Sequence, residues 1–141
     1  MLADTHNQLP EKVLKLAEGA DEIWHLGDVC AVRIIDELRA VGLPLLVVRG
    51  NCDDNAEWPL VLDVTRAGLK FRLQHIPPSQ PPDGVDVLLH GHTHVPRNER
   101  RSGVLFLNPG CVARPNQGAP ASVAFLEVRS GKVQWQPTSL R

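Results

Sequence analysis

Apolar side chains recur at helical spacing in two segments near the start of the chain. The two sets of apolar positions are Val13, Leu14, Leu16 and Ala17 in the first segment, and Ile34, Ile35, Leu38 and Val41 in the second. A glycine follows each segment, as is typical of the C-terminal end of a helix. The pattern therefore predicts two amphipathic helices, over residues 10–18 and 31–41.

Most of the remaining apolar residues form short runs or alternate with polar residues, which indicates β-strands. Strands are expected near residues 22–26, 44–49, 60–66, 69–75, 85–90, 103–107, 121–129 and 132–136. The glycine-containing segments 66–69 and 129–132 predict hairpin turns, because glycine adopts a positive φ without steric cost. Strand and helix alternate in the first half, and the second half is nearly all strand. We therefore expect an α/β fold with two face-to-face sheets and outer helices, in a single domain over residues 1–141.

Metal-ligating side chains stand beside turns in five short segments, four of which directly follow apolar runs. The segments are Asp4-Thr5-His6, Gly27-Asp28, Gly50-Asn51-Cys52-Asp53, His75 and Gly91-His92-Thr93-His94. Strands that end together at one edge of an open α/β sheet deliver the residues after them to one crevice. We therefore expect a two-metal site whose candidate ligands are Asp4, His6, Asp28, Asn51, His75, His92 and His94.

The composition of this ligand set narrows the kind of site. Seven ligands exceed the four that close a tetrahedral structural zinc site. None of them needs to be a thiolate, so the set suits manganese, iron, nickel or zinc better than a sulfur-selective ion. Asp28 is the candidate for a carboxylate that bridges two ions. His25 and His90 have apolar neighbours, and we expect both to be structural residues.

The order of the five segments resembles the calcineurin-like metallophosphoesterases. The short chain and the cysteine of Gly50-Asn51-Cys52-Asp53 resemble the YfcE-like branch of small bacterial and archaeal phosphodiesterases, and Asn108-Pro109-Gly110 resembles a loop of that branch. The resemblance extends from Ala3 to about Val112. It implies a four-layer αββα sandwich of two mixed β-sheets flanked by helices. It also implies one metal on Asp4, His6, Asp28 and His94, and another on Asp28, Asn51, His75 and His92.

The same resemblance implies a phosphodiesterase that hydrolyses a phosphate ester by attack of a hydroxide bridging two divalent metals, with manganese the first expectation. A non-catalytic interaction module on the same fold, as in retromer-type relatives, is an alternative, against which the complete histidine set argues. A phosphomonoesterase is a second alternative, but it would need more positive charge for a dianionic phosphate. We expect the nearest candidates, Arg97, Arg100 and Arg101, on a solvated turn.

The chain departs from the family pattern in four places. Only Met1-Leu2-Ala3 precedes Asp4, which predicts a short or missing first strand. Ile76 stands where the family usually has glycine, and Cys111 replaces the serine of the Asn-Pro-Gly loop. The proline-rich segment 77–82 cannot be helical, although relatives commonly place a helix there. We expect these changes to alter the lining of the site and to leave its ligands in place.

The three cysteines leave several roles open. Cys52 stands where many relatives outside the branch have a histidine that protonates or stabilises the leaving group. A thiol with a reference pKa of about 8.5 is a poor donor to an alkoxide, so Cys52 is a weak candidate for that role or a small buried packing residue. Cys30 is expected to open the second helix, with an approach to a metal as the alternative, and Cys111 is a candidate neighbour of the site.

Composition sets the remaining expectations. The 141 residues are 43% apolar and carry a net charge of -1, which argues against binding to a nucleic-acid backbone. No segment approaches the roughly 20 apolar residues of a membrane span. Three irregularly spaced cysteines argue against a disulfide framework and for the reducing cytoplasm. A small phosphoester substrate is the expected partner, and homo-oligomerisation stays open.

Overall fold

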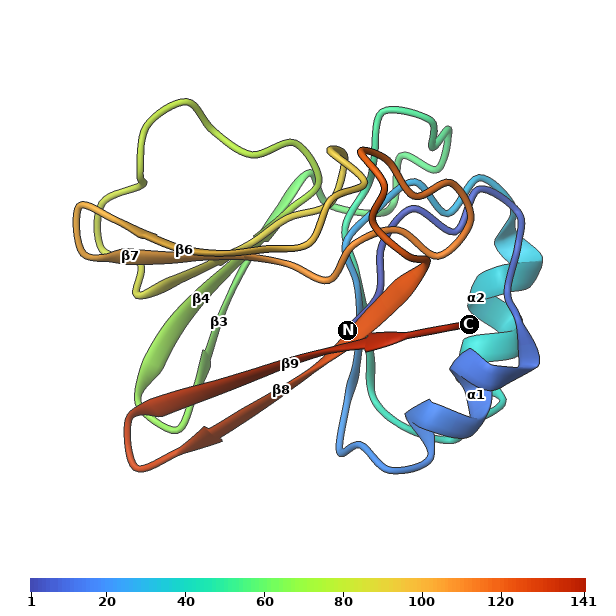
Figure 1. The fold of residues 1–141 in the computed structure, drawn as a ribbon, viewed down its shortest axis with the longest axis horizontal. Helices are drawn as coiled ribbons and strands as arrows, with labels where there is room; N and C mark the ends of the chain where they lie inside the picture. The colour runs from blue at the N-terminus through green and yellow to red at the C-terminus, as the bar shows by residue number, and fades with distance from the viewer.

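The two predicted helices both form, and they lie on one side of the molecule (Figure 1). The computed structural model describes all residues 1–141. Helix α1 spans Glu11–Ala17 and helix α2 spans Val32–Arg39. Each is shorter than its predicted range at both ends. Their buried side chains, which include Val13 and Ile34, pack into a single apolar cluster.

The first β-layer is assembled around the N-terminal residues. Strand β1 (Ile23–His25) pairs in parallel with β2 (Leu45–Val47). On the other side of β1, the Leu2 N–H donates to the Trp24 carbonyl at 3.0 Å, and the Leu2 carbonyl accepts from the Leu26 N–H at 2.9 Å.

Met1 connects this layer to the C-terminal hairpin. Its carbonyl accepts from the Ala124 N–H at 3.0 Å, and its amino group donates to the Ala124 carbonyl at 2.8 Å. Ala124 belongs to β8 (Ser122–Arg129), which pairs antiparallel with β9 (Lys132–Ser139) across the predicted hairpin turn. The expected short first strand is confirmed as a bridge between Leu2 and His25, and this short segment is hydrogen-bonded on both sides.

The second β-layer is a mixed five-stranded sheet in the order β3-β4-β5-β7-β6. Strands β4, β5 and β7 are mutually parallel, while β3 and β6 run antiparallel to their neighbours. The predicted hairpin turn connects β3 to β4. The bounds are Val61–Arg66 for β3, Leu69–Gln74 for β4, Val87–Leu89 for β5, Arg97–Arg101 for β6, and Val104–Asn108 for β7.

The prediction of a solvated turn for Arg97, Arg100 and Arg101 is wrong, because these residues form strand β6. The segment is an edge strand paired with β7, and the Arg97 and Arg101 guanidinium carbons lie 4.5 and 5.7 Å from the ring centroid of Phe106. Its residues, Arg-Asn-Glu-Arg-Arg, include no apolar side chain, so no hydrophobic pattern marked the strand. These arginines cover a buried aromatic ring on the outer face of the sheet.

Alternation along the strands produces the layered core. In β1, Ile23 packs with the helices, and Trp24 packs with Phe71 and Leu73 of the second sheet. The predicted α/β fold with two face-to-face sheets is therefore confirmed. The proline-rich segment is non-helical, as expected, and Val85 from the same connection packs on the outer face of the second sheet. No helix of the structure has the length and apolar character needed to cross a membrane.

Candidate metal centre

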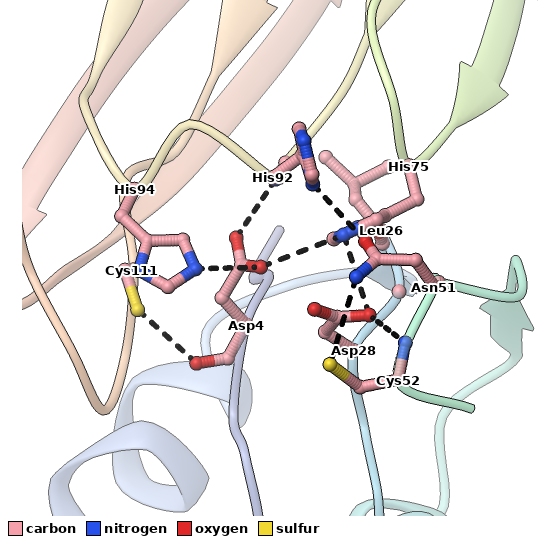
Figure 2. A network of polar contacts seen from close by, with 12 residues as sticks. Asp4, Leu26, Asp28, Asn51, Cys52, His75, His92, His94 and Cys111 are labelled. Carbon is pink, nitrogen blue, oxygen red and sulfur yellow. Dashed lines mark hydrogen bonds and ion pairs between the residues drawn. The ribbon is translucent and has the colours of Figure 1, made fainter.

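All seven predicted ligands lie in loops at one edge of the two sheets, and these loops gather at the top of Figure 1. Asp28, Asn51, His75 and the His92–His94 segment follow the carboxyl ends of β1, β2, β4 and β5 respectively. Asp4 and His6 follow the bridged N-terminal segment. Figure 2 shows several of these side chains converging on a common centre from separate loops. The candidate side chains therefore converge at the sheet edge, as the sequence predicts.

One group of ligand atoms surrounds Asp4. Its Oδ1 lies 3.3 Å from His94 Nε2 and 3.9 Å from His6 Nε2, and the two histidine nitrogens are 3.4 Å apart. Three ligand atoms this close to one another, one carboxylate oxygen and two imidazole nitrogens, form a half-shell for a single cation.

A second group of ligand atoms surrounds His75. Its Nε2 lies 3.3 Å from Asp28 Oδ1 and 3.8 Å from Asp4 Oδ1. Nearby, His92 Nδ1 lies 3.0 Å from Asn51 Oδ1, and the His75 and His92 ring centroids are 5.3 Å apart. Carboxylate, imidazole and amide groups therefore converge here as well.

Asp28 connects the two groups. Its Oδ1 faces His75, whereas its Oδ2 lies 3.8 Å from His6 Nε2 in the first group. The two oxygens of one carboxylate are therefore directed to different histidine sets. This geometry is what a bridging carboxylate between two ions requires.

Two atoms of the centre are buried without any hydrogen-bond partner, and both belong to candidate ligands. They are Asp4 Oδ1 and His75 Nε2. A buried polar atom left unsatisfied costs about 1–3 kcal/mol, so native structures seldom contain one without a reason. Both atoms are acceptors that a divalent cation would satisfy. The residues present therefore fit a metal, and this observation does not depend on any motif.

Hydrogen bonds to carbonyl groups fix the tautomers of two histidines. His75 Nδ1 donates to the Leu26 carbonyl at 2.8 Å, and His94 Nδ1 donates to the Arg114 carbonyl at 2.6 Å. A carbonyl oxygen can only accept, so Nδ1 carries the proton and Nε2 presents its lone pair to the centre. Metal-ligating histidines are oriented in this manner by their outer hydrogen bonds.

The backbone at the ligands is unusual. Five of the seven candidates have a positive φ, with values of 55° at Asp4, 41° at His6, 55° at Asp28, 67° at His92 and 59° at His94. A non-glycine residue in this region costs on the order of 1–3 kcal/mol, and such residues cluster at functional sites. The strain directs side chains from consecutive turns toward one point.

Glycines in the motifs permit the close packing of these turns. A Cβ on Gly50 would lie 2.1 Å from Asp28 Oδ1, and a Cβ on Gly91 would lie 2.9 Å from Asp4 Oδ2. Both distances are far shorter than a nonbonded carbon–oxygen contact. The glycine before each ligand therefore has a steric purpose: it allows one ligand loop to approach the carboxylate of another.

The two aspartates differ in their preference for charge. Burial raises the pKa of Asp4 to about 6, and the nearby His75 and His94 offset this only in part. Burial also acts to raise the pKa of Asp28, but the close approach of the His75 imidazole and the hydrogen bond from the Cys52 N–H outweigh it and hold that pKa well below its ordinary value. Asp28 is therefore ionised at neutral pH.

The pKa values of the histidines are also set by burial on one side and by nearby charges on the other. Burial acts to lower the pKa of His75, but the adjacent carboxylates of Asp28 and Asp4 prevail and raise it. Burial lowers the pKa of both His6 and His92, which keeps these imidazoles neutral. Neutral imidazoles beside an ionised carboxylate are the protonation states that bind a cation.

Asp53 is a functional candidate that the sequence reasoning did not assign. Its Oδ2 accepts from the Asp28 N–H at 2.9 Å and the Gly50 N–H at 2.8 Å, and its Oδ1 accepts from the Cys30 N–H at 2.8 Å. Asp53 therefore connects the turn that contains Asp28 to the turn that contains Asn51 through these hydrogen bonds. Its place as the last residue of Gly50-Asn51-Cys52-Asp53 was the only sequence signal for this role.

The Asn-Pro-Gly-Cys loop supports two of the segments that carry candidate ligands. The Asn108 amide donates to the Gly91 carbonyl and to Thr93 Oγ1, both at 3.0 Å, and so supports the His92–His94 turn. The buried Cys111 thiol donates to the Asp4 carbonyl at 3.2 Å. The expectation that Cys111 lies near the site is confirmed, and its contact is with the backbone of a ligand.

The other two cysteines lie at the mouth of the centre. Cys52 is exposed, so the alternative that it is a buried packing residue is wrong. Cys30 directly precedes the N-cap of α2, as expected, and its Sγ also lies 3.6 Å from His6 Nδ1. Burial and the charge of Asp53 raise the pKa of Cys30 to about 11, which keeps its thiol protonated.

His25 and His90 are structural, as predicted. Both are fully buried, and His25 Nε2 lies 3.1 Å from Thr5 Oγ1 while its Nδ1 accepts from the Gly27 N–H at 3.2 Å. Burial lowers the pKa of His25 to about 3 and that of His90 to about 4. Both imidazoles therefore support ligand loops in their neutral form.

Sequence comparisons agree with this site. The family model of the calcineurin-like phosphoesterase superfamily domain matches residues 1–131. The chain is 32% identical to phosphodiesterase YfcE of Escherichia coli (strain K12) over an alignment of 156 residues, which covers 89% of this chain and 84% of that protein. It is 30% identical to a probable metallophosphoesterase of Methanocaldococcus jannaschii over 134 residues, covering 82% and 68% of the two chains.

Solved structures agree as well. The Escherichia coli phosphoesterase YfcE is similar with a TM-score of 0.79 at 30% identity, covering 89% of this chain and 86% of that chain. Vps29 of Chaetomium thermophilum also has a TM-score of 0.79, at 22% identity, covering 97% and 93%. The second likeness shows a shared fold alone.

Fold and site together define a metallophosphoesterase, an enzyme whose family uses divalent metal ions. The chain belongs to the calcineurin-like phosphoesterase superfamily.

Proposed function

We propose that this enzyme hydrolyses phosphodiesters by attack of a hydroxide that bridges two divalent metal ions. The observation that carries the proposal is the pair of buried, unpartnered acceptors, Asp4 Oδ1 and His75 Nε2, at the meeting point of two ligand groups. When bound, such a pair of ions acidifies a water and neutralises charge on the phosphoryl oxygens. The 32% identity to phosphodiesterase YfcE supports the choice of reaction.

The ligand assignment follows the two groups of atoms. One ion is held by Asp4, His6, Asp28 and His94, and the other by Asp28, Asn51, His75 and His92. The division is supported by Asp28, whose two oxygens face His6 and His75 separately. Manganese is our first choice of metal, with iron, nickel or zinc as alternatives, because the ligands are oxygens and imidazole nitrogens.

The candidate ligands differ in burial, and this difference suggests which side of the centre receives the substrate. Asp4, Asp28 and His75 are buried and form the floor of the centre. Asn51 and His92 are exposed, so they form its solvent side, where a substrate phosphate arrives. Cys52 lies beside Asn51 on the same exposed turn, close enough to the centre to keep its weak candidacy for a place near the leaving group.

A diester fits the charge around the centre better than a monoester. Arg97 and Arg101 are stacked on Phe106 at the outer face of the second sheet, and Arg100 donates to the Gly103 carbonyl at 2.9 Å. The cations that the sequence offered for a dianionic phosphate are therefore engaged elsewhere. An interaction module without catalysis would not need seven ligands, five of them held in strained conformations. The three free cysteines fit the reducing cytoplasm that we propose for the enzyme.

The test is metal content measured together with turnover. Purified protein is stripped with a chelator, reloaded with Mn²⁺, Fe²⁺, Ni²⁺ or Zn²⁺, and assayed on bis(p-nitrophenyl) phosphate and on p-nitrophenyl phosphate. We expect two ions per chain, hydrolysis that is lost on stripping and restored on reloading, and a preference for the diester. Reloaded protein that cleaves only the monoester, or neither compound, would contradict the proposal.

A further inference from the structure

Exposed apolar side chains gather at one place on this molecule, next to the metal centre. Four large hydrophobic residues are exposed, and three of them line a single pocket: Leu60, Val61 and Ile76, with exposed fractions of 59%, 46% and 50%. Isolated exposed hydrophobic residues are ordinary, but a cluster in a hollow usually marks a binding site.

The pocket is formed where the ends of two paired strands meet a ligand loop. Leu60 and Val61 lie at the start of β3, and Ile76 follows the end of β4, on which Gln74 pairs with Val61. The pocket measures about 280 Å³.

This pocket shares two residues with the metal centre. Asn51 and His75, both candidate ligands, line the pocket together with Gly50. A molecule bound against Leu60 and Ile76 is therefore adjacent to the place where a phosphate would meet the metals.

The pocket also contains one cation. Arg49 lines it, and its backbone N–H donates to the Pro59 carbonyl at 2.8 Å, which fixes the start of the side chain. The guanidinium makes no hydrogen bond or ion pair within the chain. A single unpaired arginine in the lining of this pocket complements the single negative charge of a phosphodiester.

We propose that this pocket binds an aryl or similarly flat apolar substituent of the phosphodiester. In this proposal the Arg49 guanidinium pairs with the negative charge of the phosphate. The inference rests on the proposed function and adds to it the chemical class of the ester group. The size is suitable, because a cavity of about 150 Å³ lined by aliphatic residues already accepts benzene. Apolar side chains that face water in the free enzyme would be covered by the ring in the complex.

A second copy of the chain is the other candidate occupant, and the dimensions disfavour it. A stable protein interface buries about 800 Å² on each partner around a continuous apolar centre. Here the apolar surface consists of three side chains around a hollow, and polar residues, Gln74 and Arg49 among them, border it. A small substituent fits this shape better than a flat protein surface.

The experiment compares two ligands of equal charge, diphenyl phosphate and dimethyl phosphate. Their dissociation constants are measured by titration calorimetry on the Mn²⁺-loaded enzyme. We expect diphenyl phosphate to bind at least about tenfold more tightly, because even one additional methylene in an apolar pocket is worth about 10-fold or more. In the double variant Leu60→Ser/Ile76→Ser the ratio should fall to about twofold, with dimethyl phosphate unchanged.

A matched control is Val32→Ser, which removes an equally exposed hydrophobic side chain (54% exposed) outside the pocket and should leave the ratio unchanged. Thermal unfolding of each variant establishes that it is folded. Equal affinities of the wild type for both ligands, or an unaltered ratio in the double variant, would overturn the pocket assignment. A concentration-dependent dimer that the double variant abolishes would overturn it in favour of a second copy.

Turnover of bis(p-nitrophenyl) phosphate is measured separately on the same preparations. A wild type that binds diphenyl phosphate selectively and hydrolyses no phosphodiester would count against the proposed function and in favour of the pocket. A wild type that hydrolyses the diester and shows no selectivity would count against the pocket alone.

Discussion

Asp53 holds the backbone of Asp28 in place, although Asp53 is not one of the seven candidate metal ligands. The Asp28 N–H donates to Asp53 Oδ2 at 2.9 Å, and the same carboxylate also accepts from Gly50 and Cys30. The candidate bridging residue thus has its backbone fixed by one carboxylate while its own carboxylate faces two histidines. Asp53 therefore positions the centre, whereas Asp28 is among the residues that would bind metal.

The first prediction concerns that positioning role. Asp53→Ala removes the acceptor of three backbone N–H groups, so we expect the free energy of unfolding to fall by about 2–3 kcal/mol. We also expect metal affinity to fall about 10- to 100-fold, as when outer-shell partners are removed at other metal sites. Denaturant unfolding and metal titration measure the two effects. The matched control is Asp54→Ala, because Asp54 is the next residue and is exposed. Equal effects of the two substitutions would refute the role.

The second prediction concerns the bridge itself. Asp28→Asn preserves size but removes the negative charge that the two groups of ligands share. We expect turnover on bis(p-nitrophenyl) phosphate to be lost and the bound metal to fall below two ions per chain, with circular dichroism unchanged. Wild-type turnover with two ions in this variant would show that another residue is the bridge.

The third prediction concerns Cys52. Since its side chain is exposed, Cys52→Ser should change the free energy of unfolding by less than about 0.5 kcal/mol and have little effect on p-nitrophenyl diesters. Cys52→His introduces a better proton donor, so activity should rise more toward esters with alkoxide-like leaving groups than toward aryl esters. The ratio of the two rates is the measurement, and an unchanged ratio would remove any leaving-group role.

The fourth prediction concerns acid stability. Burial holds the pKa of His90 at about 4 in the folded enzyme, below the ordinary histidine value of 6.5, so the unfolded chain binds its proton first as the pH falls. The stabilising contribution of neutral His90 is present above about pH 6.5 and is lost progressively toward pH 4. The metal-free wild type should therefore lose stability faster than His90→Asn over this window. Denaturant unfolding at several pH values gives the difference, and parallel curves would contradict it.

The sequence was sufficient to bring the seven candidate ligands together and insufficient for the residues that support them. Glycine and histidine beside strand ends mark the candidate ligands, because a metal site at a sheet edge would require those residue types at those places. Strand β6 escaped prediction because Arg97–Arg101 has no apolar side chain and pairs through its backbone. The part played by Asp53 depends on contacts with residues more than 20 positions away, which no local pattern records.

The pocket beside the centre could not be predicted for a related reason. Leu60 and Ile76 are 16 positions apart, and each was read as part of a strand or as a departure from a motif. Their proximity depends on the antiparallel pairing of β3 with β4, which aligns Val61 with Gln74. Exposure of an apolar side chain is a tertiary property, and it appears only when the neighbouring elements are in place.

The left-handed backbone at five ligand positions restricts how this centre can be redesigned. Asparagine, aspartate and histidine are the non-glycine residues that tolerate this conformation best, and they are also oxygen and nitrogen ligands. Backbone shape and metal chemistry therefore select the same residue types at Asp4, Asp28 and His94. Substitutions by a β-branched residue would be opposed by the chain even if the metal were ignored. An engineer who wishes to change the bound metal must exchange ligands within that small set or rebuild the turns.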